Sequence, residues 1–486
     1  MKGFSERFTQ LLAKVPMAVV VIPFAIGIFF AEVVVLPLWL ALLACVVALA
    51  GVIFLTKWWQ SVAVAVMILT VGVLLHTFSH RGEIPYNTPV DIEIKLETSS
   101  AMREGYTSAE AKILASTERA LTGCGVVLWG DSLTQFKAGD RLRLSTQIHP
   151  FRTEREEYAR LMHHRGFIGS VAVGQHTAYD YIPAEEESLH DKAVARLRLA
   201  LPEGDARSVV LAMVTGERGE IESELRQSYS ASGASHLLAV SGLHIGIVFM
   251  LVNLLLLPLI LLRHGDVVRS IFAVAMIWGY VWMCGMSPSA IRAAIMFSLL
   301  QFSLASLRSY ASLNILSATA FLMLAFDTHL LFDISFQLSF IAVGGIIVWA
   351  MPIYKLCATR SWVANTIIGV LTVGIASTLA TLPLVAHAFR VVAVVGILIN
   401  PLVILLANAV VITGVAAMGV PGLGGAANLI AEWQNNMVAW AAELPYGHFD
   451  IALAEWVVWC IYALFIATSF AVAIAPKRKK EIKIEG

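Results

Sequence analysis

Long apolar runs alternate with one polar region along the chain, and the two parts have different hydrophobic periods. Three apolar runs, near residues 16–34, 36–56 and 61–78, come first. A helix that crosses a bilayer needs about 20 apolar residues, so each run predicts one spanning helix. The first run is too long, and is followed too quickly by others, for a cleaved signal peptide. Residues 1–80 therefore predict an N-terminal membrane segment of three helices.

Residues 81–183 follow a different pattern and predict a small soluble β domain. The run Val90-Asp91-Ile92-Glu93-Ile94-Lys95-Leu96 alternates apolar and polar residues, as does Arg141-Leu142-Arg143-Leu144. Such alternation is typical of strands with one buried face. The next stretch, 184–205, is polar and amphipathic and predicts a linker that lies along the membrane surface.

From residue 206 to 475 the chain is again apolar and predicts a second membrane domain. Nine spans are expected there, near 245–262, 267–285, 289–308, 311–327, 334–354, 364–386, 393–418, 426–444 and 452–474. Residues 476–486 form a basic tail. The predicted fold is a polytopic α-helical membrane protein with about 12 transmembrane helices and an inserted small extracytoplasmic β domain.

Basic residues orient this layout through the positive-inside rule. Lys2, Arg7 and Lys14 place the N-terminus in the cytoplasm. Three crossings leave the β domain outside the cytoplasm, and nine more return the chain to the cytoplasmic side with its basic tail. Both termini are therefore predicted to be cytoplasmic, and the expected location is the cytoplasmic (inner) membrane.

The composition excludes several classes of protein. The 486 residues are 58% hydrophobic and 14% charged, whereas soluble domains carry about 25% charged residues. Lys+Arg and Asp+Glu both number 34, so bulk positive charge does not hold nucleic acid here. Five cysteines without a CxxC pair indicate neither a disulfide framework nor a zinc site. No GxxxxGK[ST] run occurs, and neither a metal nor another cofactor is expected.

Residues 206–246 carry the most specific pattern in the chain. They are too polar for a simple span and too rich in apolar and small residues for a loop. Irregular backbone is tolerated at membrane depth only where it is buried in protein or lines a water-filled cavity, so a re-entrant or pore-lining element is predicted. Within it, Ser235-His236-Leu237-Leu238-Ala239-Val240-Ser241-Gly242-Leu243-His244-Ile245-Gly246 resembles the signature of the ComEC family of competence channel proteins.

Other segments agree with this resemblance and follow the family's order. They are residues 150–169 at the end of the β domain, the SPSxxRA segment at 287–293, the SFQLSF helix at 335–340, and the stretch from Leu382-Pro383-Leu384 to Asn400-Pro401. The resemblance implies an OB-like β domain and a channel that moves single-stranded DNA across the cytoplasmic membrane during natural transformation. It also implies, besides membrane lipid, three kinds of partner: a competence DNA receptor, a separate nuclease, and cytoplasmic ATPase and DNA-binding proteins.

Many members of the family add a C-terminal metallo-β-lactamase-like nuclease domain. No HxHxDH run follows the last predicted span of this chain. A form without that domain is therefore expected, in which another protein degrades the second strand and this chain is not an enzyme.

The candidate residues of the DNA path are His236, Ser241, His244, Arg292, Asp333, Gln337 and Asn400. Two alternative functions remain open. Ser241 and His244 are spaced i, i+3 and would share a helix face, which suits either an intramembrane hydrolase or hydrogen bonding at a helix end. A polytopic small-molecule transporter would use the same broken helices.

Three of these candidates also have a purely structural interpretation. Arg292 lies one turn into a helix begun by Ser287-Pro288, where it either faces phosphates or snorkels to the membrane surface. Asp333 is either a lining residue, on one face with Gln337, or an N-cap. Asn400 precedes a proline, which indicates either a broken helix or an ordinary kink.

In the β domain, Arg141 and Arg143 share one strand face and are the candidate DNA contacts. Residues 86–180 hold 11 basic and 12 acidic residues, so this domain offers no bulk attraction for a polyanion.

Overall fold

The computed structural model describes residues 15–474 with internal gaps. The gaps are residues 35, 57, 80–83, 98–100, 104–105, 119–120, 131–132, 134–135, 137–138, 152–158, 160–161, 164–165, 175–178, 184–187, 306–311, 394, 445–446 and 452. The predicted basic tail, the N-terminal Lys2, Arg7 and Lys14, and much of the 150–169 segment lie outside the described residues.

The first three apolar runs form the helices α2 (Pro16–Val33), α3 (Leu38–Phe54) and α4 (Trp58–Ser79). Helices α2 and α4 pack backbone to backbone at two glycines. A Cβ atom on Gly27 would collide with the main chain at Leu69, and one on Gly72 would collide with the main chain at Phe24. Small residues at such crossings let membrane helices approach closely, which suits association without a hydrophobic driving force.

The polar region forms one mixed sheet of seven strands. The strands are β1 (Pro89–Leu96), β2 (Ala101–Arg103), β3 (Tyr106–Ser116), β4 (Gly125–Trp129), β5 (Arg141–Gln147), β6 (Phe167–Ala172) and β7 (Tyr179–Ile182). Their order is β6-β4-β3-β1-β5-β7, with β2 paired to β3, and the β4–β6 pair is parallel. Every second residue of β1 is buried in the core of the sheet, which confirms the strand predicted from the alternation at 90–96.

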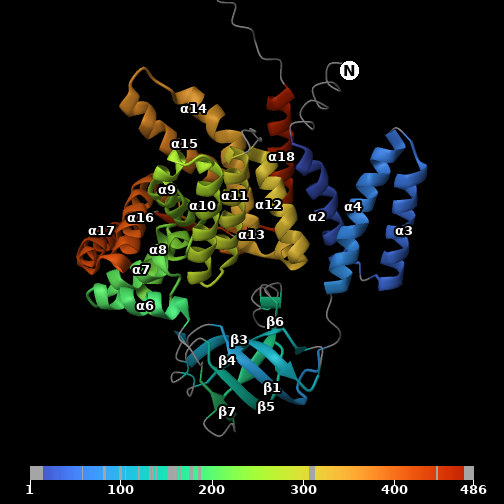
Figure 1. The fold of residues 1–486 in the computed structure, drawn as a ribbon, viewed down its shortest axis with the longest axis horizontal. Coiled ribbons are helices and arrows are strands. Elements are labelled where there is room, and N and C mark those ends of the chain that lie inside the picture. The colour runs from blue at the N-terminus through green and yellow to red at the C-terminus, as the bar shows by residue number, and fades with distance from the viewer. Residues whose placement is uncertain are drawn as a thin grey trace, which may run out of the picture.

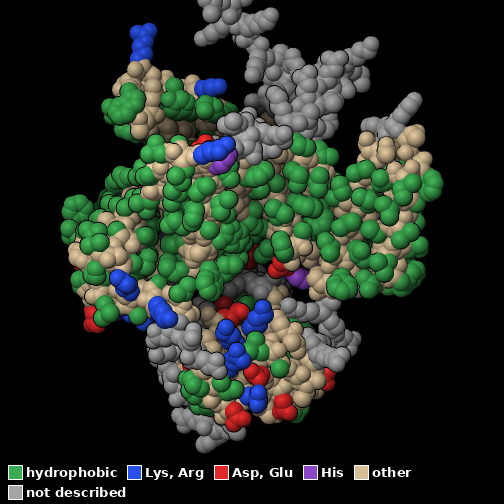
Figure 2. All heavy atoms as spheres, in the orientation of Figure 1, with side chains coloured by type: hydrophobic (Ala, Val, Ile, Leu, Met, Phe, Trp, Pro, Cys, Tyr) green, Lys and Arg blue, Asp and Glu red, His purple; other side chains and the backbone are tan. Residues whose placement is uncertain are grey.

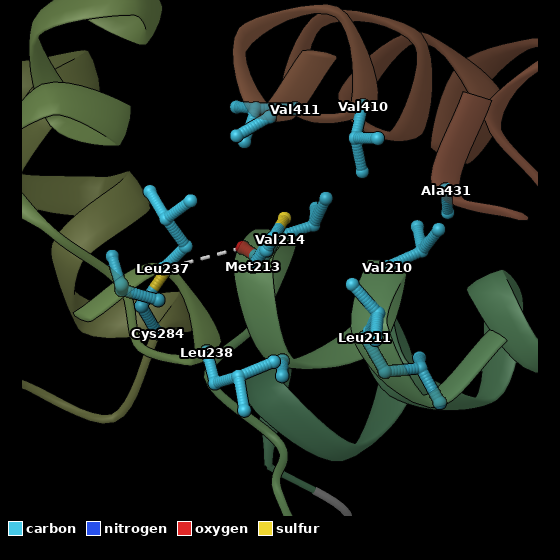
Figure 3. Close-up of a cluster of buried hydrophobic side chains, with 14 of the residues drawn as sticks. Val210, Leu211, Met213, Val214, Leu237, Leu238, Cys284, Val410, Val411 and Ala431 are labelled. Atoms are coloured by element: carbon cyan, nitrogen blue, oxygen red, sulfur yellow. Dashed lines mark hydrogen bonds between the residues drawn. The ribbon is translucent and has the colours of Figure 1, made fainter. Parts of the chain in front are cut away.

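The linker after the sheet folds into α6 (Leu189–Ala200), a helix with a capping box formed by Ser188 and Asp191. It is followed by α7 (Asp205–Val214), α8 (Ser223–Ala231), the short 3-10 helix η4 (Ser235–Leu238) and α9 (Gly242–Leu255). Figure 3 shows the side chains of α7 packed between the η4 segment and helix α16 (Val395–Gly419). Because α7 has ten residues, it covers about 15 Å and cannot span a bilayer. It forms the centre of the largest core instead.

The remaining chain is helical apart from a small hairpin. The elements are η5 (Leu257–Leu261), α10 (Gly265–Met283), α11 (Pro288–Ala305), α12 (Ser312–Phe326), η6 (Thr328–Phe332), α13 (Ile334–Gly345), the π-helix η7 (Ile346–Ala350), α14 (Met351–Cys357), α15 (Trp362–Ala388), α16, η8 (Pro421–Leu423), α17 (Gly424–Ala442) and α18 (Glu455–Ile474). The strands β8 (Val391–Ala393) and β9 (His448–Asp450) pair antiparallel. Each predicted run from 245 onward overlaps at least one helix, although α9 ends at Leu255 and the 245–262 run is completed by η5.

Six helices in the described part of the chain are long and apolar enough to cross a membrane. They are Pro16–Val33, Trp59–Ser79, Gly265–Met283, Ile334–Cys357, Trp362–Ala388 and Ile399–Gly419. The helical part exposes apolar side chains over most of its visible surface (Figure 2), which soluble monomers rarely do. The protein is therefore mostly helical and membrane-spanning, and it carries a small mixed sheet.

The sheet lies at one end of the helical part (Figure 1). Helix α4 ends on the side of the sheet, whereas α2 begins and α18 ends on the opposite side. The two ends of the described chain thus share one face of the helical part.

Candidate functional site

A cavity of about 4480 Å³ lies between the sheet and the helices and continues among the helices. Small-molecule pockets are usually about 300–1,000 Å³, so this cavity has room for a polymer segment. Figure 2 shows the hollow beneath the helical part, with acidic and basic side chains around it. The sheet contributes the outward residues of β1, β3 and β4, among them Lys95, Lys112 and Trp129.

Helix α15 lines the cavity along most of its length. Its lining residues run from Asn365 to Val385, and these 20 steps cover about 30 Å at 1.5 Å per residue. That distance equals the roughly 30 Å thickness of a bilayer's hydrocarbon core. Small and polar residues predominate on this face: Asn365, Thr366, Gly369, Gly374, Ser377, Thr378 and Thr381. Sequence reasoning treated 364–386 as a plain span and missed this stripe, although its spacing of three to four residues was visible.

Ser241 and His244 form a capping box at the start of α9. The Ser241 Oγ atom accepts the His244 backbone N–H at 3.4 Å, and His244 Nδ1 accepts the Ser241 backbone N–H at 3.3 Å. Each side chain therefore bonds the main chain, and the hydroxyl is not hydrogen-bonded to the imidazole as a serine nucleophile requires. Ser241 lines the cavity, whereas His244 is fully buried behind it and its Nε2 has no partner among the described residues.

His236, in η4, and Asn400, in α16, both line the cavity although they are far apart in the sequence. His236 is exposed in η4, and Gly233 just before it adopts φ +77°, where a Cβ would lie 2.8 Å from the Cβ of Ala393. The turn at Gly233 therefore packs directly on the end of β8 and the start of α16. Helix α16 runs unbroken through Asn400 and Pro401, so of the two alternatives the structure contains a proline within a helix and not a break.

Arg292 is a buried cation in the cavity wall, 4% exposed. Its guanidinium donates to the Ser335 carbonyl at 3.2 Å and to Ser289 Oγ at 3.1 Å, and it lies 5.7 Å from the centre of the Phe340 ring. These contacts hold it inside the protein, so it does not snorkel to the membrane surface. Asp333 lines the same cavity.

Three helix N-termini converge on this cavity. Ser241 caps α9, Ser287 accepts the Ala290 N–H at the start of α11, and Asp333 accepts the Phe336 N–H at 2.8 Å at the start of α13. All three capping residues line the cavity. Helix N-termini carry partial positive charge, and interrupted membrane helices use it to bind anionic groups. Gln337, by contrast, donates to the Leu331 carbonyl at 2.9 Å and does not line the cavity.

The arginines predicted as contacts on the sheet are already paired. Arg143 lies 2.9 Å from Glu93 and Arg141 lies 3.7 Å from the same carboxylate, and neither lines the cavity. The sheet presents Lys95 and Lys112 there instead, directly opposite each other on β1 and β3. Like charges in opposing positions repel, and Glu97 and Glu110, the next facing residues along the same two strands, line the cavity beside this pair. Neither lysine was a candidate from the sequence, because only the two arginines Arg141 and Arg143 were chosen there as DNA contacts.

An ion pair sits at the cavity edge near the linker. His190 Nε2 lies 3.6 Å from Glu217, and its Nδ1 lies 2.9 Å from the Met283 carbonyl. The contact with Glu217 raises the pKa of His190, and the same contact lowers the pKa of Glu217. The described residues contain no group of three or more His, Cys, Asp or Glu that could hold a metal ion.

A model of the competence protein family matches residues 213–477, which is 265 of 486 residues. The chain belongs to the competence protein family. The matched range of this competence protein includes the three helix N-termini, Arg292, the α15 stripe and Asn400. The sheet and helices α2 to α4 lie before it.

Three relatives are similar to parts of this competence protein. ComE operon protein 3 of Bacillus subtilis (strain 168) is 29% identical over 252 residues, 51% of this chain and 31% of that protein. An uncharacterized protein of Aquifex aeolicus (strain VF5) is 28% identical over 235 residues, 48% of this chain and 53% of that protein. YcaI, an uncharacterized protein of Escherichia coli (strain K12), is 24% identical over 286 residues, 54% of this chain and 37% of that protein. The matches thus span about half or less of each relative's length, and no solved structure matches the chain.

Proposed function

We propose that this protein is a channel that conducts single-stranded DNA across the cytoplasmic membrane during natural transformation. Membership of the competence protein family supports a role in DNA uptake. The observation that carries the channel itself is the cavity, which follows α15 for about the thickness of a bilayer and opens toward the sheet.

The chemistry of the wall suits a flexible polyanion. The N-termini of α9 and α11 and the guanidinium of Arg292 supply positive potential at the cavity, where phosphodiester groups pass, whereas the Asp333 carboxylate offsets that of the α13 N-terminus. Hydroxyl and glycine positions on α15 supply a hydrated surface without a strong binding charge. Conduction requires binding weak enough to release the strand, and a cavity whose basic lining residues are accompanied by acidic ones, such as Glu97, Glu110 and Asp333, meets that requirement better than a basic groove.

The proposed architecture has about 12 membrane crossings, with both termini in the cytoplasm and the sheet outside. The six long apolar helices and the five shorter ones support this count. The two ends of the described chain lie on the face away from the sheet, which supports the orientation. The strand pairings β1–β3, β3–β4 and β1–β5, the parallel β4–β6 pair and the bridge between His149 and Ser170 support an OB-like barrel.

The proposed partners are single-stranded DNA, a competence DNA receptor, a separate nuclease, and cytoplasmic ATPase and DNA-binding proteins. Energy and strand degradation come from these partners, and this chain acts without a catalytic site of its own. The capping-box geometry of Ser241 and His244 supports this assignment over a hydrolase.

A bulky residue in the α15 stripe tests the channel. Ser377→Phe places a ring in the cavity, whereas Leu379→Phe enlarges a side chain that is 44% exposed and does not line it. Each variant is expressed in a deletion strain, and labelled transforming DNA is measured in the cytoplasm. Ser377→Phe is expected to lower uptake about tenfold or more while Leu379→Phe leaves it unchanged. Normal uptake by the deletion strain itself would rule out the channel.

A further inference from the structure

A chain of polar side chains joins the N-terminal helices to the rest of the protein. The imidazole of His76, in the last turn of α4, is fully buried. Its Nε2 lies 2.8 Å from Glu32 Oε2 on α2, and its Nδ1 lies 2.9 Å from Thr328 Oγ1 at the start of η6. Ionisable groups inside membrane segments are costly, and where they occur they commonly carry protons or ions. None of the three residues lines the cavity described above.

The hydroxyl groups around His76 can satisfy the imidazole in either of two protonation states. Ser79 Oγ donates to the His76 carbonyl at 2.8 Å and lies 3.0 Å from Thr328 Oγ1. With a neutral imidazole, Nε2–H donates to Glu32 and the Thr328 hydroxyl donates to Nδ1. With a protonated imidazole, Nδ1–H donates to Thr328 Oγ1, and the Thr328 hydroxyl turns to donate to Ser79 Oγ. Every donor has an acceptor in both states, and the direction of the bond between His76 and Thr328 is what changes.

We propose that the Glu32–His76 pair is a proton-binding site that links the N-terminal helices to the channel. One proton enters from water through the Glu32 carboxylate, whose side chain is 32% exposed, and is held on the imidazole. Uptake changes the charge of the pair from −1 to zero by adding one proton and nothing else. The hydroxyls of Thr328 and Ser79 keep the site hydrogen-bonded in both protonation states. A buried hydrogen bond with only a structural role does not need such a second arrangement.

A short covalent path leads from this site to the cavity. Thr328 is the first residue of η6, which ends at Phe332, and the next residue, Asp333, caps α13 in the cavity wall beside the Arg292 segment. A changed bond at Thr328 therefore acts five residues from a lining group. This part of the proposal rests on the proposed channel function, because only a conducting cavity makes the link a regulatory one.

Few other ionisable groups face the pair from the elements packed against it. In the described part of the chain they are His329, whose ring centre lies 5.1 Å from that of His76, and Asp327, which accepts the His329 N–H at 3.0 Å. Helix α12, which packs on α2, contributes no acidic or basic residue. Residues 80–83 lie outside the described part, and their His80, Arg81 and Glu83 stay native in every variant.

A titration of the full-length protein in lipid nanodiscs tests the site without DNA. The protein carries ¹³C-labelled histidine, and the His76 signal is assigned as the one that His76→Gln removes. The signal is followed between about pH 4 and 9; it is expected to change as one proton binds, and Glu32→Gln is expected to move the midpoint of that change. Thr328→Val keeps the shape and both ionisable groups but removes the hydroxyl, and should also move the midpoint.

Asn314→Ala is the matched control. It removes the 2.9 Å bond from the Met17 N–H, which also joins α2 to the rest of the protein, without touching an ionisable group. It should leave the His76 midpoint in place. A His76 signal that does not titrate over this range, or that titrates identically in Glu32→Gln, overturns the proton site.

Uptake of labelled DNA at graded external pH tests the regulatory link. The wild-type profile should vary with pH, and both His76→Gln and Glu32→Gln should flatten it while Asn314→Ala keeps its shape. A profile in the two variants that follows the wild type overturns the link. If the wild type conducts no DNA, the proposed function fails, and the nanodisc titration still decides the proton site by itself.

Discussion

At the residue scale, charge in this protein acts through few and tightly held groups. Among the described lining residues, helices α9 to α16 contribute a single cation to the cavity, Arg292. Its hydrogen-bond partners are a carbonyl and a hydroxyl, which orient its positive charge, and the carboxylate of Asp333 lies close enough to interact with that charge. Both groups lie in the cavity wall of a chain whose net charge is zero.

The contrast between Ser241 and Arg292 gives a prediction at this scale. Ser241→Ala removes an N-cap, which should lower the free energy of unfolding by about 1 kcal/mol but leave most DNA uptake intact. Arg292→Gln keeps a polar side chain and removes the charge, and is expected to reduce uptake about tenfold through the lost phosphate contact. Thermal unfolding and labelled-DNA uptake, measured on both variants, separate the two effects. Complete loss of uptake in stable Ser241→Ala protein would instead favour a hydroxyl with a chemical role.

At the element scale, the sequence predicted those strands and helices that the pattern of neighbouring residues determines. The alternation at 90–96 predicted β1 because each apolar residue there enters the sheet core. The apolar runs predicted the helices because a helix that is buried in lipid or in protein needs a continuous stretch of apolar residues. Helix α7 was missed as an element, because its ten residues, eight of them buried, are too few to stand out from the loops around them.

The candidate site was predictable only in part, because its elements meet over long sequence separations. Ser241, Ser287 and Asp333 each sit in a recognisable motif, but nothing local indicates that their three helix N-termini share one cavity. The pairing of Arg143 with Glu93 depends on strand register, which joins residues 50 positions apart. The stripe on α15 was hidden because a mean over the whole run does not distinguish the two faces of a helix.

The glycine contact between α2 and α4 gives a prediction about packing. Gly27→Ala adds one methyl group against the Leu69 main chain, which cannot move aside as a flexible side chain can. The expected loss is about 1–3 kcal/mol of stability. Gly279→Ala, on α10, is the matched control because its new methyl group meets no atom within 4 Å. Thermal unfolding of both variants in the same detergent tests this, and equal midpoints would contradict the close helix contact.

At the scale of the whole molecule, the sheet and the helices form two walls of one cavity. The sheet brings the opposed Lys95 and Lys112, and the helices bring partial charges at their N-termini. The described residues that line the cavity include as many acidic as basic side chains, so the balance of the whole chain is repeated around the cavity. The contacts of His190 join α6 to the segment after α7 and to the end of α10, and the strength of the contact with Glu217 depends on pH.

The His190–Glu217 pair gives the pH prediction for the folded protein. The raised pKa of His190 contributes stability below its ordinary value of 6.5, and that stability is lost as pH rises through the raised pKa. The lowered pKa of Glu217 contributes stability above its ordinary value of 4.5, which is lost as pH falls through the lowered pKa. Both contributions are therefore present together between pH 4.5 and 6.5.

Thermal unfolding of wild type and His190→Gln across pH 4 to 9 tests this window, which follows from the ordinary pKa values of the two groups. The midpoint difference should be largest near pH 5 to 6, at about 1–2 °C for a pair worth about 1 kcal/mol. It should shrink toward pH 9 as the imidazole of the wild type loses its proton. Glu217→Gln removes the partner of His190 and should lower the unfolding midpoint over the same pH window. The double variant should be little less stable than either single variant, because all three lose the same contact. A midpoint difference that stays constant with pH would mean that His190 stabilises the helical part through its bond to the Met283 carbonyl and not through its charge.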